Sequence, residues 1–374
     1  MKIGITCYPT YGGSGAVATE LGIALAERGH EVHFISYRQP FRLPSFLPGV
    51  YFHEVHVGQY PLFEYPPYDL ALAVRMHEVV RQYGVELLHC HYAIPHATSA
   101  WIAREMLHKT GEDVALVTTL HGTDITLVGQ DPSFNAITKF SIERADRITA
   151  VSQYLRAETI NAFQCTACTV NVIYNFVDPR VYDRALYETG RHPFGAHNRV
   201  LMHISNFRPV KRVRDVVRIF ARVCQEIPSV LVMVGDGPER TAAEEEARHL
   251  GVSHSVYFLG KIDAVAPLLA DADLFLLPSQ SESFGLSALE ALASGVPVVG
   301  SDAGGIPEVV ENGVTGLLYP VGDVDAIAEG ALSILRDPER HGAMAAAAAT
   351  DARERFALDT VVSQYEALYR SALP

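Results

Sequence analysis

The feature that most constrains the fold of this chain is an alternation of short apolar runs with longer helical patterns, found in both halves of its 374 residues. The runs lack clean polar alternation, which is typical of strands buried on both faces of a parallel sheet. We predict strands at residues 2–8, 31–37, 86–92, 114–120 and 147–152, and again at 199–205, 229–235, 256–260, 272–279 and 296–301. Helices are predicted between them at 15–28, 69–83, 211–226 and 285–294.

An alternation that occurs twice predicts an α/β fold with two doubly wound, Rossmann-like domains. Single hydrophobic cores stop growing at roughly 250–300 residues, so the length of the chain also favours two domains. We place the boundary in the segment 175–178, with one domain at 1–175 and the other at 176–356. Ligands of open α/β sheets bind beyond the carboxyl ends of the strands, so we expect the domains to face a central cleft.

The composition excludes several classes of protein. The formal net charge is −13, whereas proteins that bind nucleic acid or dock on membranes usually carry a basic excess. We find no run of about 18 apolar residues, so no membrane span is predicted. The first strand begins at Lys2 and leaves no room for a signal peptide, which favours a cytoplasmic protein. The sequence leaves the oligomeric state open, with a homo-oligomer as one possibility.

The cysteines and histidines do not predict a metal site. Cys165 and Cys168 form a lone C-x-x-C without the second pair that a zinc site needs, and we expect no disulfide framework among the five cysteines. We expect the side chains of His89 and His91 to point to opposite faces of a strand. Packing or hydrogen bonding is therefore the default role of the histidines, and His121 is the one candidate for function.

The loop after the first predicted strand is rich in glycine. In PTYGGSGAVATELG, at 9–22, Gly12, Gly13 and Gly15 let the backbone approach a ligand closely, and the following helix directs its free amides at an anion. The stretch matches neither the dinucleotide-binding pattern nor a P-loop. A helix cap without a ligand explains these glycines equally well.

A second loop is rich in cations. SNFRPVKRVRD, at 205–215, places Arg208, Lys211, Arg212 and Arg214 at a strand-to-helix turn. The helix N-terminus is itself positive, so cations here are unfavourable unless a multiply charged anion such as a diphosphate binds. The alternative is a solvated basic patch.

The most informative stretch is SQSESFGLSALEALASGVPVVG, at 279–300, in which Glu282 and Glu290 stand eight residues apart. A helix that begins near Gly285 would present the amides of Leu286 and Ser287 to a phosphate. The two carboxylates are candidate acceptors for hydroxyl groups, one of a sugar and one of a ribose.

Taken together, these stretches resemble the retaining GT-B glycosyltransferases that use nucleotide sugars. The resemblance covers nearly the whole chain and rests on Glu282-x7-Glu290, GDGPE at 235–239, FLGK at 258–261 and GGIPEVVENGVTGLLY at 304–319. Within that group, ITCYPTYGGSGAVATELG, YFHEVHVGQYPLFEYPPYDLALA, HYAIPHA, TTLHGTDIT and HISNFRPVKRV are similar to the N-acetyl-α-D-glucosaminyl L-malate synthases of bacillithiol biosynthesis.

The resemblance implies a retaining hexosyltransferase that moves N-acetylglucosamine from UDP-N-acetylglucosamine to L-malate without a metal or other cofactor. It also implies a C-terminal helix, within 357–374, that packs on the N-terminal domain. In catalysis, the malate hydroxyl would attack on the face that UDP leaves, and the departing β-phosphate oxygen would take its proton.

The resemblance further implies roles for single residues. Glu290 would hold the uridine ribose and Lys261 the uracil through its backbone, while Glu282 would hold hexose hydroxyls. The implied catalytic residues are Lys211, Glu282 and His121. The implied donor-binding residues are Gly15, Asn206, Arg208, Lys211, Lys261, Glu282, Phe284, Gly285, Leu286, Ser287 and Glu290. The implied acceptor-binding residues are Ser14, Tyr92, His121, Thr123 and Asn206.

This sequence departs from the broad family at one place. Many members have an Arg five residues before the Lys, where this chain has Asn206. Arg208 or Arg212 is therefore expected to assist Lys211 at the diphosphate, which leaves Asn206 able to contact the acceptor.

Three rival functions remain open. A UDP-sugar epimerase would turn over the nucleotide sugar without an acceptor, and no dedicated acid–base pair in the sequence favours it. A glycosyltransferase with another acceptor, such as a sugar or a membrane lipid, is the second, and a lipid would call for a basic, apolar docking surface. The third is a catalytically inactive module that only binds a sugar nucleotide.

Overall fold

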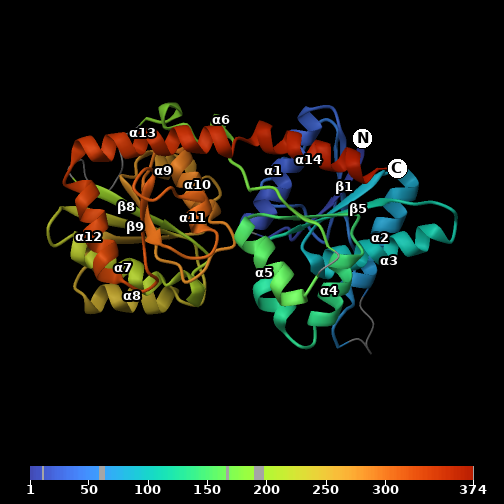
Figure 1. Cartoon of the computed structure of the whole chain (residues 1–374), viewed down its shortest axis with the longest axis horizontal. Coiled ribbons are helices and arrows are strands. Elements are labelled where there is room, and N and C mark those ends of the chain that lie inside the picture. Colours follow the sequence, from blue (N-terminus) through green and yellow to red (C-terminus); the bar gives the residue numbers. More distant parts are fainter. Residues whose placement is uncertain (11, 59–63, 166–167, 189–197, 374) are drawn as a thin grey trace. The chain divides into compact units, whose positions relative to one another are not determined.

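The computed structural model describes residues 1–10, 12–58, 64–165, 168–188 and 198–373. It divides into two compact units (Figure 1), an N-terminal unit of Met1–Asn175 with Leu358–Pro374 and a C-terminal unit of Phe176–Ala357. The division falls at the start of the segment 175–178. Part of the stretch YFHEVHVGQYPLFEYPPYDLALA, at 59–63, lies outside the described residues.

The N-terminal unit is built on a seven-stranded sheet in the order β3-β2-β1-β4-β5-β6-β7, and every pair of neighbours is parallel. The strands are β1 Lys2–Thr6, β2 Glu31–Ser36, β3 Val50–Glu54, β4 Leu87–His91, β5 Ala115–Leu120, β6 Arg147–Ala150 and β7 Val170–Val172. The helices are α1 Gly13–Glu27, α2 Tyr68–Tyr83, α3 Thr98–His108, α4 Asn135–Glu143, α5 Gln153–Phe163 and α14 Leu358–Ala372. Short helical turns occupy Ala93–Ala97, Thr123–Leu127 and Val128–Gln130.

The C-terminal unit is built on a six-stranded parallel sheet in the order β10-β9-β8-β11-β12-β13. The strands are β8 Arg199–Ile204, β9 Ser229–Val234, β10 Val256–Gly260, β11 Leu274–Leu277, β12 Val298–Ser301 and β13 Gly316–Tyr319. The helices are α6 Pro179–Tyr182, α7 Val213–Val223, α8 Arg240–His249, α9 Ala266–Ala270, α10 Leu286–Ala293, α11 Ile306–Val309, α12 Val324–Leu335 and α13 Pro338–Arg355, with short turns at Arg184–Leu186, Pro209–Lys211 and Ser253–Ser255. Both doubly wound parallel sheets that the sequence predicts are thus confirmed.

The central strands read as apolar runs because both of their faces are covered. Every residue of β4 and of β9 is buried. The strands that the sequence analysis missed are different in kind: β3 is mostly exposed or half-buried, β7 has three residues and β13 has four. Such short or partly solvated strands lack the continuous apolar run on which the prediction depends.

The C-terminal helix α14 belongs to the N-terminal unit and lies beside α1 (Figure 1). Its Tyr369 hydroxyl lies 2.8 Å from Nδ1 of His89, and both side chains are fully buried. At the surface, Arg28 of α1 donates to the side chains of Asp359 and Glu366. Because α14 itself supplies one partner of this fully buried contact, the helix is an integral part of this unit's core.

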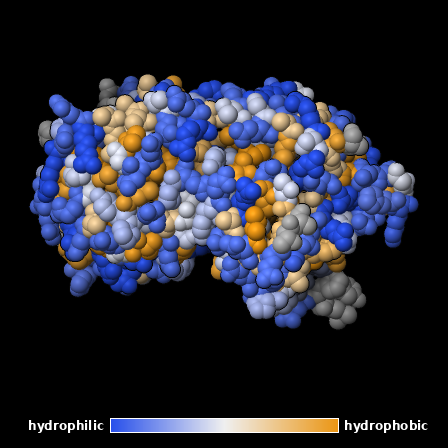
Figure 2. All heavy atoms as spheres, viewed as in Figure 1, coloured by the Kyte–Doolittle hydropathy of each residue, from blue (hydrophilic) through white to orange (hydrophobic). Residues whose placement is uncertain are grey.

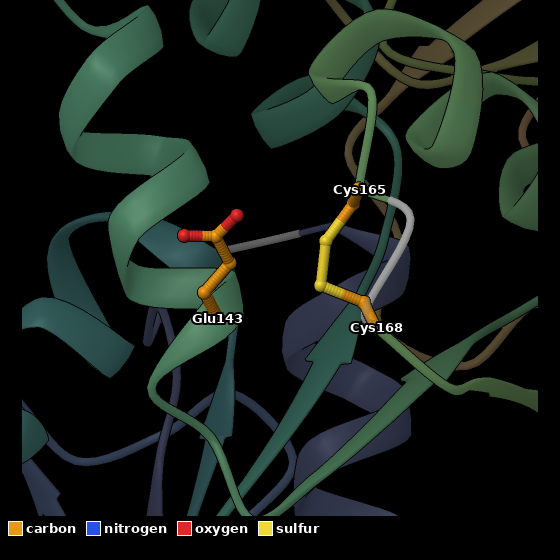
Figure 3. A group of neighbouring side chains, drawn as sticks. All are labelled: Glu143, Cys165 and Cys168. Atoms are coloured by element: carbon orange, nitrogen blue, oxygen red, sulfur yellow. A yellow bond between two sulfur atoms is a disulfide. The ribbon is translucent and has the colours of Figure 1, made fainter.

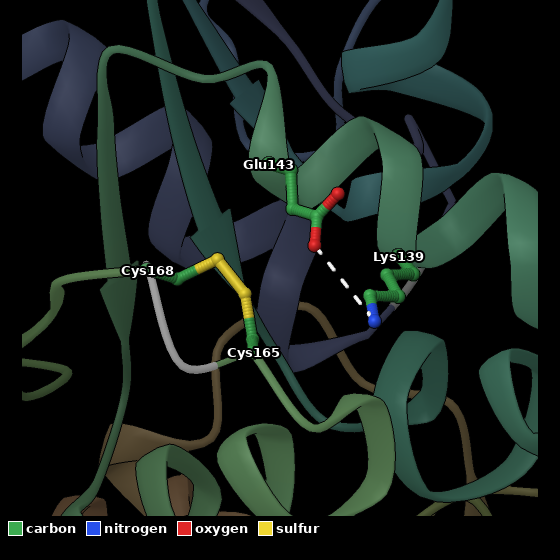
Figure 4. Close-up of a disulfide and its surroundings, with 4 residues drawn as sticks. All are labelled: Lys139, Glu143, Cys165 and Cys168. Atoms are coloured by element: carbon green, nitrogen blue, oxygen red, sulfur yellow. Dashed lines mark ion pairs between the residues drawn. A yellow bond between two sulfur atoms is a disulfide. The ribbon is translucent and has the colours of Figure 1, made fainter.

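The structure joins Cys165 and Cys168 in a disulfide, which the sequence analysis did not predict. The carboxylate of Glu143, at the end of α4, lies near the two sulfur atoms (Figure 3) and pairs with Lys139 at 3.9 Å (Figure 4). Among the described residues, this trio is the group whose ligand atoms lie close enough together to hold a metal. Both sulfurs are committed to the disulfide, so the trio offers no thiolate in this state.

Hydrophilic residues cover much of the face shown in Figure 2, with smaller apolar patches between them. Within the described ranges, no helix has both the length and the apolar character that a bilayer crossing requires.

His203, on β8, is a fully buried histidine with two partners. Its Nδ1 lies 2.8 Å from the carbonyl oxygen of Leu276, and its Nε2 lies 2.8 Å from the hydroxyl of Ser205. A carbonyl can only accept, so the neutral ring carries its proton on Nδ1 and Ser205 donates to Nε2. Burial lowers the pKa of His203 to about 4.

This burial predicts acid sensitivity. The unfolded chain binds a proton at this histidine below pH 6.5, but the folded chain does not until about pH 4. The contribution of His203 to the free energy of unfolding is therefore constant above pH 6.5 and falls by roughly 3 kcal/mol between the two pKa values. Urea unfolding at several pH values should show that His203→Asn reduces the pH slope in this range by up to one proton. An unchanged pH slope in His203→Asn would contradict this assignment.

Candidate active site

In each sheet, the strand order reverses beside the first strand of the unit. β1 lies between β2 and β4, and β8 lies between β9 and β11. At such a switch point the loops after the two neighbouring strands leave in opposite directions, which opens a place for a ligand at the carboxyl ends of the strands. In each unit, the predicted site residues come from the loops at this edge and from the first two turns of the helices that follow them.

In the C-terminal unit, an ion pair joins the two loops at the switch point. Nζ of Lys211, in the loop after β8, lies 2.7 Å from both carboxylate oxygens of Glu282, in the loop after β11. Ser279 donates a further hydrogen bond of 2.9 Å to Oε1 of Glu282. The loops also bond directly, from the amide of Gln280 to the carbonyl of Val210. Lys211 and Glu282 are partly exposed, with 19% and 11% of their side chains accessible, so a ligand can reach both.

Helix α10 begins directly after this loop with an uncapped N-terminus. Gly285 is its N-cap, no side chain caps the helix, and its first turn contains no acidic residue. Gly285 has a φ of 102°, which L side chains rarely adopt, so glycine is required at this entry into the helix. Leu286 and Ser287 therefore stand, partly exposed, at the positive end of the helix dipole, as the sequence predicted.

Glycines of two neighbouring motifs, GDGPE and GGIPE, pack against the backbone of these loops. A Cβ on Gly305 would lie 2.6 Å from the carbonyl oxygen of Ser283, and the amide of Gly305 donates to the carbonyl of Glu282. On the other side, a Cβ on Gly235 would lie 1.8 Å from the carbonyl oxygen of Ser205. The glycines of the GDGPE and GGIPE stretches thus pack directly against the backbone of the two loops. A larger residue at either glycine would move the loop of Lys211 or of Glu282.

The basic cluster of residues 205–215 divides into two kinds of cation. The side chain of Arg212 is bonded to Asp215, and that of Arg214 is bonded to Glu246. The prediction that helix α7 starts at residue 211 was wrong, because Lys211 ends a short turn and α7 begins at Val213. Arg208 is exposed at the start of that turn, and its side chain has no ion pair with the residues that the structure describes.

The remaining predicted donor residues are spread over the same edge of the sheet. Lys261 is exposed at the end of β10, and Asn206 is exposed after β8. The ring of Phe284 is buried against Phe356, so only its backbone is suited to contact a ligand. Glu290, on the second turn of α10, is 8% exposed and accepts a hydrogen bond from Tyr182, a residue that the sequence analysis did not select.

In the N-terminal unit, Ser14 and Tyr92 meet across the other switch point. The Tyr92 hydroxyl, after β4, donates to Oγ of Ser14, after β1, at 3.0 Å. Burial raises the pKa of Tyr92 to about 12, so its hydroxyl keeps its proton at neutral pH. Gly15 is required beside Ser14 because a Cβ there would lie 2.7 Å from the carbonyl oxygen of Tyr8. Thr123 lies beside the Tyr92 hydroxyl, and its hydrogen bond to that hydroxyl partly offsets the rise in the pKa of Tyr92.

His121 is held by a neighbouring histidine. Its Nε2 lies 2.8 Å from Nδ1 of His91, and its ring lies 5.3 Å from that of Tyr92. Burial, with a smaller effect of His96, lowers the pKa of His121 to about 3. His121 is therefore neutral near pH 7 and acts as a hydrogen-bonding group, not as a cation.

The expectation that His89 and His91 point to opposite faces was wrong. Residues two apart on a strand share a face, and the centroids of these rings are 4.3 Å apart. Both nitrogens of His89 are engaged, by Thr119 and by Tyr369. These contacts, not the direction of the side chains, disfavour His89 as a metal ligand.

Asp124 is a site residue whose role the sequence did not reveal. Its carboxylate is 2% exposed and accepts hydrogen bonds from the amides of Ala93, Gly122 and His121. Burial nevertheless raises the pKa of Asp124 to about 6. Because its three donors come from the loops after β4 and β5, Asp124 fixes the backbone on which Tyr92 and His121 stand.

Comparisons with known proteins identify the family of the chain. The family described as "Glycosyltransferase Family 4" matches residues 11–181, and "Glycosyl transferases group 1" matches residues 190–351. An N-acetyl-alpha-D-glucosaminyl L-malate synthase from Bacillus anthracis is 49% identical over 375 residues, which cover 100% of this chain and 97% of that protein. A D-inositol 3-phosphate glycosyltransferase from Kribbella flavida is 30% identical, over 96% of this chain and 91% of that protein.

Solved structures show the same fold at lower identity. A sucrose-phosphate synthase from Thermosynechococcus elongatus has a TM-score of 0.78 at 22% identity, with 99% of this chain and 98% of that chain covered. Anabaena HepE, in complex with UDP and glucose, has a TM-score of 0.77 at 22% identity and covers 99% and 100%. The family matches, the full-length relatives and the two doubly wound units together show that the chain belongs to the group 1 glycosyltransferases of the GT-B fold.

Proposed function

We propose that this glycosyltransferase moves N-acetylglucosamine from UDP-N-acetylglucosamine to the hydroxyl of L-malate, with retention at the anomeric carbon. The observation that carries the proposal is the 49% identity, over the full length, to a protein of that named activity. Identity at this level, without a gap in coverage of either domain, favours the same pair of substrates.

The charges at the C-terminal switch point support a diphosphate ligand. Lys211 is balanced by Glu282, so the pair brings no net charge to the site. The N-terminus of α10 adds about half a positive charge. The diphosphate of a UDP-sugar carries about two negative charges, so one more cation is needed, and Arg208 is the exposed candidate. In the proposal, Lys211, Arg208 and the amides of Leu286 and Ser287 hold the diphosphate.

The acceptor is assigned to the N-terminal switch point. Helix α1 starts there without a side-chain cap and without an acidic residue in its first turn, which favours a carboxylate ligand. The Tyr92 hydroxyl, protonated at neutral pH, supplies a donor, and Ser14 and Thr123 supply hydroxyls beside it. Within this unit, neutral His121 completes the proposed polar contacts with the acceptor.

The proposed mechanism uses charge stabilisation and needs no covalent intermediate. The bond from the anomeric carbon to the β-phosphate oxygen breaks, and the malate hydroxyl attacks from the same face. The departing oxygen takes the hydroxyl proton, while Lys211 and the amides at the start of α10 stabilise the charge that develops on UDP. Glu282, held by Lys211 and Ser279, is placed to accept hydrogen bonds from hexose hydroxyls.

The reaction is tested by measuring UDP release from UDP-N-acetylglucosamine in the presence of EDTA, with and without L-malate. We expect release that depends on malate and is unaffected by the chelator, because the proposed mechanism uses protein cations in place of a metal. The product should be an α-linked glycoside, which NMR of the anomeric proton identifies. Release with another acceptor only would refute malate, and turnover without any acceptor would favour an isomerase or hydrolase.

The cations are tested by comparing three alanine variants. Lys211→Ala should lower kcat/KM by on the order of 10²–10³, as loss of a preorganised donor to a developing charge does. Arg208→Ala should lower it by about tenfold or more. Arg214→Ala is the matched control, because its side chain is bonded to Glu246; it should alter stability but not kcat/KM. Equal effects of Arg208→Ala and Arg214→Ala would contradict the assignment of Arg208.

A further inference from the structure

Tyr182 lies outside every motif that the family resemblance uses, yet it contacts a predicted site residue. It ends α6, the short helix Pro179–Tyr182 near the start of the C-terminal unit. Its side chain is 3% exposed, and its hydroxyl donates to Oε1 of Glu290 at 2.6 Å. A bond this short between a hydroxyl and a carboxylate is of the strong, charge-assisted kind.

Two features fix the position of this hydroxyl. The side chain of Asp178 caps α6 by accepting from the amide of Arg180, and the amide of Val177 donates to the carbonyl of Phe356. The cap thus fixes the start of the helix that carries Tyr182, and the backbone bond holds the preceding residue to the rest of the C-terminal unit. Because these contacts are independent of Glu290, Tyr182 can orient the Glu290 carboxylate.

The bond from Tyr182 engages one of the two carboxylate oxygens of Glu290, Oε1. A carboxylate offers about four acceptor positions, and one hydrogen bond from Tyr182 uses one of them. Glu290 stands on α10, one turn beyond Leu286 and Ser287, the residues assigned to the diphosphate. A ribose that is linked to that diphosphate would be within the reach of the same helix, and its two vicinal hydroxyls are donors that match a carboxylate.

We propose that Tyr182 is a positioning residue that holds the Glu290 carboxylate in the orientation needed to bind the ribose diol, and so sets the preference for a ribonucleotide donor. The proposal deepens the proposed function and rests on it. We expect the ribose to be bound equally well in the ground and transition states, so loss of this contact should raise KM for the donor and leave kcat nearly unchanged.

The test is calorimetry of UDP and 2′-deoxy-UDP binding to the full chain, because it needs no acceptor. Tyr182→Phe removes only the hydroxyl, and we expect it to weaken UDP binding by about tenfold. It should weaken 2′-deoxy-UDP binding much less, so that the preference for ribose falls. In a Glu290→Gln background, Tyr182→Phe should have a much smaller effect, because the charged partner is gone.

A matched control is available in the same segment. The Tyr187 hydroxyl donates to the carbonyl of Val181, so Tyr187→Phe makes the same change without touching Glu290. It should keep the wild-type preference for ribose, and thermal unfolding of all variants separates a loss of fold from a loss of binding. Steady-state kinetics should show the rise in KM without a fall in kcat.

The outcomes distinguish the two proposals. If Tyr182→Phe weakens the binding of both nucleotides equally, or of neither, the proposed role of Tyr182 is overturned. The proposed transferase reaction is then unaffected. If Tyr182→Phe selectively weakens UDP binding but the wild-type protein does not use malate, the role of Tyr182 is supported and malate is refuted as the acceptor. Failure of the wild-type chain to bind any uridine nucleotide would overturn both.

Discussion

The ion pair between Lys211 and Glu282 is the interaction on which the rest of the site depends, because it ties together the two loops that diverge at the switch point of the C-terminal sheet. Removing one partner would leave a partly buried charge without its counter-charge, which costs more than the pair itself contributes. Ser279 and the amide contacts of Gly305 hold Glu282 from other directions. The loops are therefore preorganised before a ligand arrives, which is the condition for charge stabilisation in a transition state.

The N-terminal unit uses the same topology with other chemistry. Its switch point is joined by the neutral hydrogen bond between Tyr92 and Ser14, with Asp124 fixing the backbone behind it. The neighbouring histidines are kept neutral by burial. Tyr92 itself has a positive φ of 93°, an unfavourable conformation for a tyrosine that the surrounding contacts must enforce. The C-terminal unit thus concentrates charged side chains at its switch point, which suits the proposed nucleotide site. The N-terminal unit concentrates neutral hydrogen-bonding groups, which suits the proposed acceptor site.

Much of this was predictable from the sequence, and the exceptions have physical reasons. The central strands were found because burial on both faces makes them continuously apolar, and the loops after them carry many of the predicted site residues, such as Lys211 and Glu282. Strand order, however, depends on contacts between distant segments, so the two switch points could not be read from the chain. Side-chain pairing was equally hidden: nothing local indicated that Arg212 is bonded to Asp215 whereas Arg208 stays exposed. Tyr182 was missed because its partner is 108 residues away.

Binding of a UDP-sugar at the switch point of the C-terminal sheet can be tested by a crystal structure of the full chain with UDP-N-acetylglucosamine. We expect a β-phosphate oxygen within hydrogen-bonding distance of Nζ of Lys211 and of the amides of Leu286 and Ser287, with the hexose hydroxyls at Glu282. A diphosphate bound without contact to Lys211 or to the N-terminus of α10 would contradict it.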